Sequence, residues 1–586
     1  MKNTSSSVLP SHERSLSRGA RMVLRQRYLA RNGNGRVIET PRQMFKRIAA
    51  DVARAERRYP DKTRLPRAAM RFYEMMASLD FLPNSPTLMN AGRPLQQLSA
   101  CFVLPVEDSL SEILESVRNQ ALIHQSGGGT GFSFSRLRPQ DDFVASTSGV
   151  ASGPLSFMRI FNLTTDVIKQ GGMRRGANMG VLRVDHPDIL DFIALKTNPH
   201  EMTNFNLSVG LTDAFMEARR RNERYPLLNP RTGRPVGRIP ARTVFDRLVA
   251  AAWTSGEPGV LYLDTINRAN PVAHLGAIEA TNPCGEQPLL PYESCTLGSI
   301  NVARYLLRQH GRTEIDYSRL AETIPLAVRF LDDVLDRNRY PLPEIEAATL
   351  RTRKIGLGIM GFADLLIALD IPYDTEEALR TASRLMAFVQ SHAHDASRRL
   401  AEERGPFPGY EGSRFARRRD PRRHATVTTI APTGTISILA GCTPGIEPLY
   451  AVQTVRTIMD GTRLVTLHPA FRRMARAAGL DVSRLLPHLN ESPSIRHHFG
   501  VPPHLRRLFV TAHDVDPAHH VRMQAIFQHY SDSGVSKTVN LPNAATTAQV
   551  ADAFLLAYRL GCKGLTVFRT GSRAQQVLSC AVTQTC

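Results

Sequence analysis

Residues 281–289 read Thr-Asn-Pro-Cys-Gly-Glu-Gln-Pro-Leu and place the thiol of Cys284 between the amide of Asn282 and the carboxylate of Glu286. Pro283 fixes φ at about −65° and Gly285 permits conformations closed to other residues, so a loop could present the three side chains together at its tip. We interpret the segment as a loop for chemistry at sulfur. The alternative is a structural cysteine beside an ordinary turn, and residues elsewhere in the chain must decide between the two.

The composition is that of a large globular protein. The chain has 586 residues, of which 42% are hydrophobic and 22% charged. No apolar run approaches the roughly 20 residues of a membrane-spanning helix. Seven cysteines in so long a chain do not make a disulfide scaffold, and no secretory signal opens the sequence. We therefore expect a soluble protein of the reducing cytoplasm, with no membrane partner, whose cysteines serve chemistry.

The formal net charge is +21, and the excess is mostly arginine spread through the chain. Two short basic tracts, Arg417–Arg419 and Pro421–His424, are interpreted as solvated loops in preference to a nucleic-acid site. Polyanionic small molecules such as nucleotides remain attractive ligands for a chain of this charge.

Helical patterns come first in the chain and α/β alternation follows. Thr40 precedes Pro41, and Gln43 lies three residues after this cap, which predicts the start of a helix. Downstream, an amphipathic pattern over residues 320–335 and a buried strand over Thr426–Ile430 belong to an alternation that indicates α/β structure. We expect a disordered basic arm over 1–26, an N-terminal helical region over 27–80, one α/β domain over 81–572 and a flexible tail over 573–586.

Two other cysteines lie in polar or glycine-rich settings. Cys101 lies far upstream of the loop, whereas Cys295 follows Cys284 closely. Neither spacing suits a zinc site, and no metal-ligand set is predicted. Three such cysteines are consistent with one reactive thiol and a pair that cycles between dithiol and disulfide.

Five separated motifs carry a family resemblance. Together, and in this order, they resemble the catalytic chain of a ribonucleotide reductase of the adenosylcobalamin-dependent class II, over roughly Thr40 to Arg573. The motifs are Pro83–Gly92, the segment around Cys101, Ser126–Gly131, Asn282–Glu286 and Ala431–Ser437.

The resemblance implies a fold and a reaction. The fold is a ten-stranded α/β barrel of two antiparallel five-stranded parallel halves, with the Cys284 loop as a central finger and a helical region beside it. The reaction converts a ribonucleotide, a diphosphate in preference to a triphosphate, into the 2′-deoxyribonucleotide. Cys284 would become a thiyl radical, Glu286 would act as general base and Asn282 would bind the substrate. Cys101 and Cys295 would supply two electrons and end as a disulfide.

The same resemblance implies binding residues. Asp108, Arg138, Arg174 and Arg175 match a dNTP effector site at the interface of a homodimer, and Gln170–Asn178 resembles the loop that relays effector identity. The resemblance places the loop Pro432–Ile436 around the diphosphate of the substrate. This threonine- and glycine-containing loop enters a helix, so it also offers backbone N–H groups and a positive helix end to an anion. The residues implied at the substrate are Ser85, Ala100, Cys101, Gly129, Asn282, Pro283, Cys284, Gly285, Glu286, Pro432, Thr433, Gly434, Thr435 and Ile436.

Missing motifs indicate the radical source. The sequence has no Tyr-Tyr pair, which class I enzymes use to receive a radical from a separate metal-containing subunit. Gly561–Arg569, His520–Gln524 and Ser536–Pro542 resemble class II segments. Adenosylcobalamin is therefore the expected cofactor, and no radical-generating metal subunit is expected as a partner. The motif Asp-x-His-x-x-Gly is absent, so no cobalt ligand is predicted.

The tail carries Cys580 and Cys586, which could pass electrons from thioredoxin or glutaredoxin to the active-site disulfide. Their five intervening residues exceed the usual close spacing of such a pair. Two alternatives from other functional classes remain. Another radical enzyme on the same barrel would not use Cys101 and Cys295, and a nucleic-acid-binding protein would account for the positive charge.

Overall fold

Helices form the N-terminal part of the chain. The computed structural model describes residues 16–60, 64–144, 148–168, 176–309, 311–457, 463–572 and 578–579. The predicted helix start is confirmed, because the Thr40 side chain accepts from Gln43 N while the Gln43 side chain accepts from Thr40 N. The elements here are α1 (Arg18–Val23), the π-helical turn η2 (Leu24–Tyr28), α2 (Pro41–Ala53), the 3₁₀ turn η3 (Arg54–Arg58) and α3 (Arg64–Ala77).

The expected disordered arm over 1–26 is wrong for residues 16–26, where α1 and η2 are folded. Ser17 caps α1 by accepting from Ala20 N at 3.0 Å, and Ala20, Val23 and Leu24 are buried. A helix of six residues is too short to show a periodic apolar face in the sequence, so its burial depends on the barrel beneath it. Residues 1–15 lie outside the described part of the chain.

Five parallel strands make the first half of the barrel, in the sheet order β2, β3, β6, β7, β10. They are β2 (Cys101–Leu104), β3 (Gly129–Ser133), β6 (Asn178–Arg183), β7 (Phe205–Leu211) and β10 (Gly259–Tyr262). The helices of this half are α5 (Leu110–Gln125), α6 (Gly153–Val167), α7 (Ile189–Ala194), α8 (Asp213–Arg220), α9 (Ala241–Ser255) and α10 (Leu263–Ala269).

The second half is also parallel. β13 (Ser294–Asn301) pairs with β16 (Ile355–Met360), and β19 (Thr538–Leu541) pairs with β20 (Gly564–Arg569). Single parallel bridges, Leu357 to Thr428 and Ile430 to Val535, continue the sheet between these pairs. The predicted strand over Thr426–Ile430 is therefore an extended segment with two bridges, not a regular ladder.

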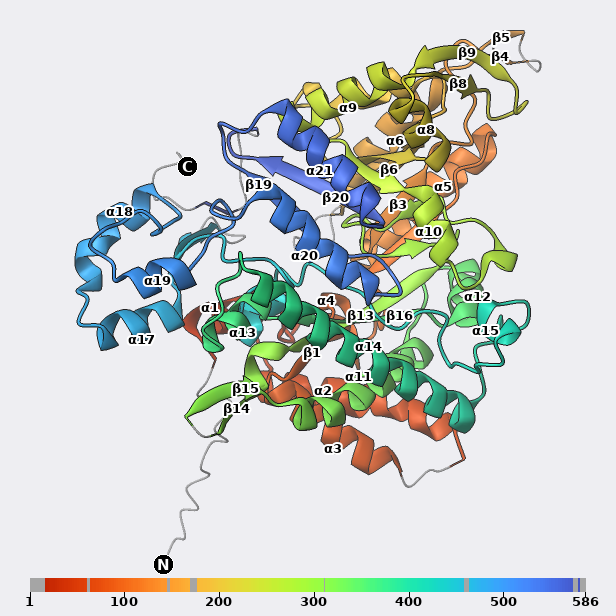
Figure 1. The fold of residues 1–586 in the computed structure, drawn as a ribbon. Helices are drawn as coiled ribbons and strands as arrows, with labels where there is room; N and C mark the ends of the chain where they lie inside the picture. Colours follow the sequence, from red (N-terminus) through yellow and green to blue (C-terminus); the bar gives the residue numbers. More distant parts are fainter. Residues whose placement is uncertain are drawn as a thin grey trace, which may run out of the picture.

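The two halves join antiparallel, β13 to β2 and β20 to β10. With the bridged segment, the described residues form the expected ten-stranded barrel of two five-stranded halves (Figure 1). β1 (Phe81–Pro83) adds an antiparallel strand to β13. The helices of the second half and its insertions are α4 (Ser85–Asn90), α11 (Tyr317–Arg337), α12 (Pro343–Thr352), α13 (Phe362–Ala368), α14 (Glu376–Arg404), α15 (Arg414–Arg417), α16 (Ile436–Ala440), α17 (Pro469–Ala477), α18 (Leu486–Glu491), α19 (Pro503–Leu508), α20 (Pro517–His529) and α21 (Thr547–Arg559).

Small hairpins form separate sheets outside the ten-stranded sheet. They are β4 (Phe143–Val144) with β5 (Gly149–Val150), β8 (Arg224–Leu228) with β9 (Pro235–Pro240), β11 (Ala280–Thr281) with β12 (Pro288–Leu289), β14 (Leu306–Gln309) with β15 (Arg312–Ile315), and β17 (Gln453–Thr457) with β18 (Arg463–Leu467). The C-terminal β21 (Leu578–Ser579) pairs with β17. No helix among the described residues is long and apolar enough to cross a membrane.

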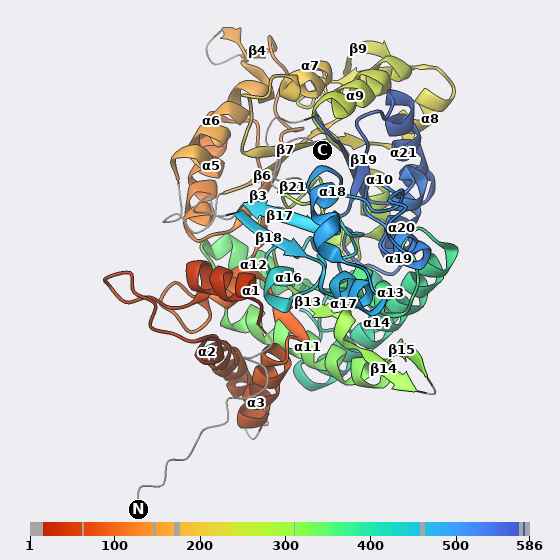
Figure 2. The same cartoon turned by 90° about the vertical axis from the view of Figure 1, so that its left-hand side faces the viewer.

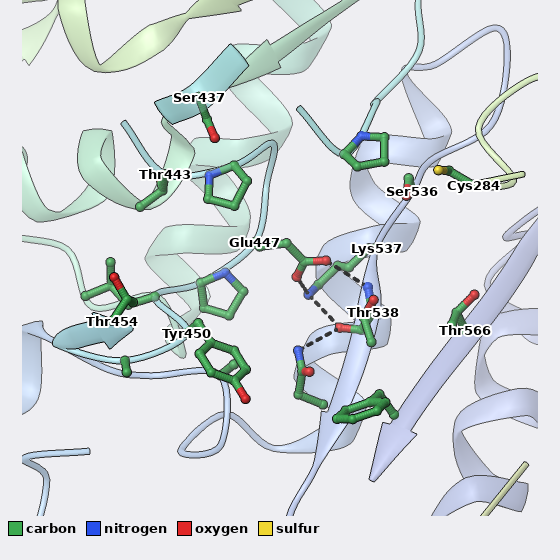
Figure 3. A pocket seen from close by; sticks show the side chains of 18 of the residues that line it. Cys284, Ser437, Thr443, Glu447, Tyr450, Thr454, Ser536, Lys537, Thr538 and Thr566 are labelled. Carbon is green, nitrogen blue, oxygen red and sulfur yellow. Dashed lines mark hydrogen bonds and ion pairs between the residues drawn. The ribbon is translucent and has the colours of Figure 1, made fainter. Parts of the chain in front are cut away.

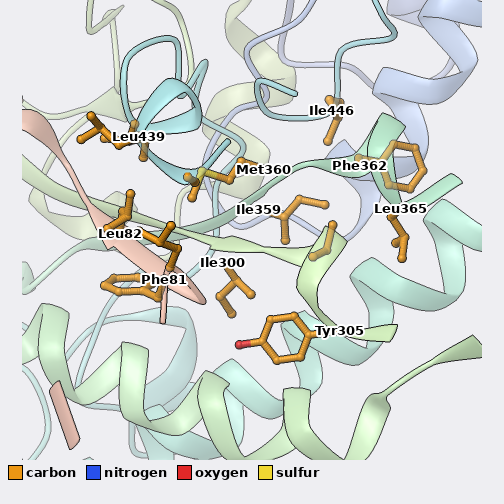
Figure 4. Close-up of a cluster of buried hydrophobic side chains, with 14 of the residues drawn as sticks. Phe81, Leu82, Ile300, Tyr305, Ile359, Met360, Phe362, Leu365, Leu439 and Ile446 are labelled. Atoms are coloured by element: carbon orange, nitrogen blue, oxygen red, sulfur yellow. The ribbon is translucent and has the colours of Figure 1, made fainter. Parts of the chain in front are cut away.

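The N-terminal helices share one apolar core with the second half of the barrel. Phe81 and Leu82 of β1 pack with Ile300 of β13 and with Ile359 and Met360 of β16 (Figure 4). The same cluster includes buried residues of α1, α2 and α3. The helical region is therefore built onto the barrel wall, and its first turns lie beside α16 (Figure 2).

Candidate functional site

The finger loop is a tight hairpin between β11 and β12. Asn282 N donates to Gln287 O at 3.1 Å, and Gly285 N donates to Asn282 O at 3.1 Å. The Asn282 side chain closes the loop from within, because its Oδ1 accepts from Gln287 N at 2.9 Å. Gly285 has a φ of +80°, in the left-handed region that favours glycine. The predicted turn chemistry thus produces the predicted loop.

Both halves of the barrel hold this loop inside. From the first half, a Cβ on Gly131 would lie 1.8 Å from Thr281 O, and one on Gly129 would lie 3.0 Å from Pro283 Cγ. From the second half, Gly534 N donates to Glu286 O at 2.8 Å and Thr429 Oγ1 donates to the same oxygen at 3.0 Å. We call Gly129, Gly131, Thr429 and Gly534 the cradle. Because the glycines of the cradle have no side chains, space remains for the loop at the centre of the barrel.

Three thiols converge on the finger loop. Cys101 of β2 and Cys295 of β13 are directly opposite each other across the antiparallel junction of the two halves. Opposed side chains in such a pair have Cβ atoms about 4.5–5.5 Å apart, so a small movement would allow a disulfide. Asn282 Nδ2 donates to Cys101 Sγ at 3.1 Å, whereas Cys284 is exposed at the tip. The three predicted cysteines are thus brought together with Asn282.

Glu286 is buried on the side of the loop that faces the opposed cysteines, with 2% of its surface exposed. Burial raises the pKa of Cys295 well above its usual value, and the nearby Glu286 carboxylate raises it further. Cys295 is therefore held as a neutral thiol with an S–H bond. Two neutral thiols that join as a disulfide release two electrons and two protons, and the nearby carboxylate can accept a proton.

A large cavity opens in front of Cys284. Its volume is about 1380 Å³, and it exceeds the roughly 300–1,000 Å³ typical of a small-ligand site. Figure 3 shows Cys284 at one side of the cavity, with Ser536, Thr538 and Thr566 from the β19 and β20 walls and Thr443 on the opposite wall. These hydroxyl groups are neutral hydrogen-bonding partners for a large polar ligand. No group of His, Cys, Asp and Glu side chains in the described ranges could hold a metal ion.

A buried charge cluster forms part of the cavity wall. Lys537 Nζ donates to Glu447 Oε2 at 2.7 Å and to His520 Nδ1 at 2.9 Å, and Glu447 Oε1 accepts from Thr538 N at 2.8 Å. His520 Nε2 donates to Ala512 O at 3.0 Å, so its Nδ1 is the acceptor. Burial and the adjacent Lys537 lower the pKa of His520 well below its usual value, which keeps it neutral. His520 and Lys537 lie within segments that resemble class II sequences, but no role for either could be predicted from the sequence.

The segment predicted to bind phosphate, Pro432–Ile436, is a short strained loop. Thr433 has a φ of +52°, which is rare for a β-branched residue. Its hydroxyl accepts from Gly445 N at 2.7 Å, and a Cβ on Gly434 would meet nothing within 4 Å, so the loop is open there. The helix that follows, α16, has only five residues. So short a helix has only a small positive charge at its N-terminus. The groups that can donate to a phosphate here are therefore the hydroxyl and backbone N–H groups.

Ser85 and Ala100 are also predicted at the substrate. Ser85 is the first residue of α4, and Ala100 directly precedes β2. The Ser85 hydroxyl is 2.8 Å from Tyr28 Oη, and Ala100 O accepts from Gly129 N at 3.0 Å. Thr435 Oγ1 accepts from Arg27 Nη1 at 3.3 Å. Arg27 and Tyr28 fall within the region 27–80 that the sequence predicted to be helical, but no local pattern there indicates a contact with the barrel, so neither residue was predicted at the site.

The predicted effector residues are only partly described. Arg138 Nε donates to Asp108 Oδ2 at 2.9 Å, so this pair is in contact. Arg174 and Arg175 lie outside the described residues, and so do Cys580 and Cys586. β21 ends one residue before Cys580 and pairs with β17, whose hairpin partly lines the cavity.

Comparison with known families decides the classification. The model "Ribonucleotide reductase, barrel domain" matches residues 99–568, and "Ribonucleotide reductase, all-alpha domain" matches residues 14–96. The chain belongs to the ribonucleotide reductase large-chain family. The family resemblance inferred from the five motifs is therefore confirmed, and the second model begins within the arm that the sequence reading had taken as disordered.

Relatives of this ribonucleotide reductase chain include two proteins named vitamin B12-dependent ribonucleoside-diphosphate reductase. The one from Thermoplasma acidophilum is 47% identical, and the one from Mycobacterium tuberculosis strain H37Rv is 52% identical; the matches cover 97% of this chain and 81% and 80% of those proteins. The solved α subunit of the Actinobacillus ureae class Id ribonucleotide reductase is similar in fold. It has a TM-score of 0.77 at 22% identity, with 95% of this chain and 97% of that chain covered.

Proposed function

We propose that this chain reduces ribonucleoside diphosphates to 2′-deoxyribonucleotides in an adenosylcobalamin-dependent reaction. The observation that carries the proposal is the placement of one exposed thiol, Cys284, between a large cavity and a buried pair of opposed thiols, Cys101 and Cys295. The names of the relatives at 47% and 52% identity support both the substrate and the cofactor.

The buried side of the loop suits the reduction. As a thiyl radical, Cys284 takes the 3′ hydrogen of the ribose, Glu286 accepts the 3′ hydroxyl proton, and Asn282 orients the sugar. The 2′ C–O bond breaks and its oxygen leaves as water. Cys101 and Cys295 give up two electrons and two protons, a C–H bond replaces the C–O bond, and an S–S bond forms between the two sulfurs. Cys284 then returns its hydrogen to the 3′ carbon and is left as a thiyl radical again.

The cavity side suits the cofactor. The volume of about 1380 Å³ and the mixture of apolar, hydroxyl and charged side chains on its walls fit a large polar group. The β19 and β20 wall and the segment around Glu447 would hold it against Cys284. When bound, adenosylcobalamin supplies the one-electron chemistry that oxidises the thiol.

The test is incubation of the purified chain alone with CDP or GDP, adenosylcobalamin, a dithiol and each dNTP in turn. We expect deoxynucleotide from the parent and none from Cys284→Ser. Cys442→Ser, at a thiol that also borders the cavity, is the matched control and should retain turnover. Absence of product with every dNTP, or equal activity of Cys284→Ser and the parent, would refute the proposal.

We further propose a homodimer that pairs through α5 and α6. Leu110 and Leu114 on α5, and Leu163 and Val167 on α6, are large apolar side chains between 48% and 68% exposed. The spacing of four residues on each helix forms a stripe that a second copy can cover under twofold symmetry. Leu163→Asp should shift the protein towards monomer in sedimentation velocity, whereas Leu307→Asp on β14 should not. An unchanged sedimentation coefficient for Leu163→Asp would exclude this interface.

The effector and the reductant complete the proposal. The Asp108–Arg138 pair lies just before α5 and beyond β3, next to the proposed interface, and we assign it with Arg174 and Arg175 to dNTP binding. Cys580 and Cys586 would carry electrons from thioredoxin or glutaredoxin in the cytoplasm, where thiols stay reduced. Cys580→Ser should impair turnover with thioredoxin but spare it with a small dithiol. Equal loss with both reductants would rule out the shuttle.

A further inference from the structure

The π-helical turn η2 lies between two segments of the proposed substrate site. Tyr28 Oη is 2.8 Å from Ser85 Oγ, and Arg27 Nη1 donates to Thr435 Oγ1 at 3.3 Å. Two successive residues of the N-terminal region therefore reach two segments of the barrel, at Ser85 and at Thr435, that the family resemblance implies at the substrate. The preceding helix α1 packs against α16, and its residues Arg18, Gly19 and Met22 border the large cavity.

Buried neighbours and a backbone hydrogen bond hold the turn that carries Arg27. The turn is closed by a hydrogen bond from Leu29 N to Leu24 O at 3.0 Å, which is the π-helical pattern. Leu24 and Tyr28 are 0% and 1% exposed, so they anchor both sides of Arg27. Arg93 Nη2 also donates to Tyr28 O at 2.7 Å. Single π-helical turns occur frequently at functional sites because they redirect one or two side chains.

The phosphate loop lacks a counter-charge of its own. Residues 431–437 contain hydroxyl, apolar and glycine side chains and no basic residue. A nucleoside diphosphate would bring two or more negative charges to this loop. Neutral donors alone leave such charge uncompensated in a partly buried site, whereas a guanidinium pairs with phosphate in a bidentate geometry.

The hydrogen bond to Thr435 has the polarity needed for an anion site. The Arg27 guanidinium is the donor and the Thr435 oxygen is the acceptor, so the hydroxyl hydrogen of Thr435 can be donated to a further acceptor. A phosphate oxygen placed beside the open face of Gly434 would then meet a hydroxyl donor with a positive charge directly behind it.

We propose that Arg27 binds the diphosphate of the substrate together with Thr435, and that Tyr28 positions Ser85 at the same nucleotide. This inference rests on the proposed function and adds an electrostatic contact from outside the barrel to its neutral phosphate loop. Arg27 acts in binding, not in the radical chemistry. Its removal should therefore weaken ground-state and transition-state binding equally and raise KM with little change in kcat.

The experiment is titration calorimetry of CDP, CMP and cytidine against the parent, Arg27→Met and Arg27→Lys, with KM and kcat measured in parallel. Arg27→Met should weaken CDP binding about 10- to 100-fold, as expected for loss of a hydrogen bond between charged groups. The effect should be smaller for CMP and absent for cytidine. Arg27→Lys keeps the positive charge but loses the planar guanidinium that can make two parallel hydrogen bonds, so it should recover part of the affinity.

The matched control is Arg25→Met, an exposed arginine on the same turn, which should bind CDP like the parent. Equal CDP affinity of Arg27→Met and the parent would overturn the inference, and so would a loss of cytidine binding as large as the loss of CDP binding. The thermal unfolding midpoint of each variant identifies misfolding, in which case Arg27→Gln replaces Arg27→Met. If the parent itself binds and reduces no nucleotide, the proposed function fails, which is a distinguishable result.

Discussion

At the scale of single residues, Asn282 has two separate tasks. Its Oδ1 closes the finger loop by accepting from Gln287 N, and its Nδ2 donates to the sulfur of Cys101. An amide is the side chain of this size that can accept and donate at once. The residue therefore joins the loop conformation to the proposed reducing pair.

Asn282→Asp separates these tasks. The carboxylate keeps the acceptor for Gln287 N but removes the donor and places a negative charge beside Cys101. We expect turnover with a dithiol to fall about 5- to 30-fold, in line with a lost hydrogen bond of about 1–2 kcal/mol, while the thermal midpoint stays within about 3 °C of the parent. Steady-state kinetics and a thermal scan check this. Unchanged turnover would show that the contact with Cys101 is dispensable.

The residues that the sequence predicted to lie together on one loop share a local signal. Asn282, Cys284 and Glu286 lie within five residues, and the turn former Gly285 adopts the expected positive φ. Arg27 and Thr435 are 408 positions apart, and only the folded barrel brings them together. No local pattern in either segment encodes that contact, so it could not be predicted without the fold.

At the scale of elements, the cradle explains why the finger loop occupies the barrel. Where the loop passes β3 and the segment before β19, both have glycines, and the loop occupies the space that a side chain would fill. The loop is then fixed from opposite walls, by packing against β3 and by two hydrogen bonds to Glu286 O from Thr429 and Gly534.

Gly131→Ala should break this arrangement. Its Cβ would lie 1.8 Å from Thr281 O, so the loop or β3 must shift, at a cost of about 1–3 kcal/mol or more. We expect a lower thermal midpoint and loss of turnover. Gly237→Ala on the exposed hairpin strand β9, where a Cβ meets nothing within 4 Å, is the control and should behave like the parent. A fully stable and active Gly131→Ala protein would contradict the cradle.

Lys563 supports the cradle from behind and makes its stability pH-dependent. Its Nζ donates to Asp532 O at 2.5 Å and to Ser533 O at 2.9 Å, immediately before Gly534. Burial lowers the pKa of Lys563 from 10.5 to about 8. Below pH 8 both the folded and unfolded states hold the proton, and the folded state bears the full cost of a buried charge. Between pH 8 and 10.5 the unfolded state holds more protons, so this contribution to stability rises with pH.

The expected gain over that interval is about 3 kcal/mol, from roughly 1.4 kcal/mol for each unit of pKa difference. The urea midpoint should therefore rise more between pH 7.5 and pH 10 for the parent than for Lys563→Met, because the substitution removes the titrating group. The same substitution at the exposed Lys46 should leave the pH profile of the parent unchanged. Parallel profiles for the parent and Lys563→Met would show that Lys563 does not titrate in this range.

At the scale of the whole molecule, a buried ionic network joins the helical region to the barrel. Arg404 at the end of α14 is 0% exposed and donates to Asp332 and Asp333 of α11 and to Glu56 of η3, each at 2.7 Å. Asp332 also accepts from Arg353, Arg423 and His424. The surrounding cations hold the pKa of Asp332 well below its usual value despite burial.

Arg404→Met should be strongly destabilising, because it leaves three buried carboxylates without their shared cation. Breaking one side of a buried ion pair typically costs about 3–5 kcal/mol. We expect a clear fall in the urea midpoint at pH 7 that is partly recovered at lower pH, where the carboxylates take up protons. Arg399→Met, on the exposed face of the same helix, should have no effect. A midpoint equal to that of the parent would contradict this role of the network.

This network corrects the sequence-based interpretation of the tract Pro421–His424. Arg423 and His424 are buried partners of Asp332, and Arg422 pairs with Asp420, so the tract is neither a solvated loop nor a nucleic-acid site. Arg417–Arg419 is exposed as expected. The α/β class and the barrel could be predicted from motifs in order along the chain, whereas which charges become buried depends on acidic partners about 90 residues away.

The finger loop can be enclosed only after the second half of the barrel has been synthesised. Thr429, which closes the loop from the second half, lies 143 residues after Glu286. At a synthesis rate of about 5–20 residues per second, the ribosome needs about 7 to 30 s to add that stretch. For this interval Cys284, Cys101 and Cys295 are all present in a nascent chain that cannot yet close around them. Under the proposed function, these three thiols have to stay reduced until the last strands of the barrel have been synthesised.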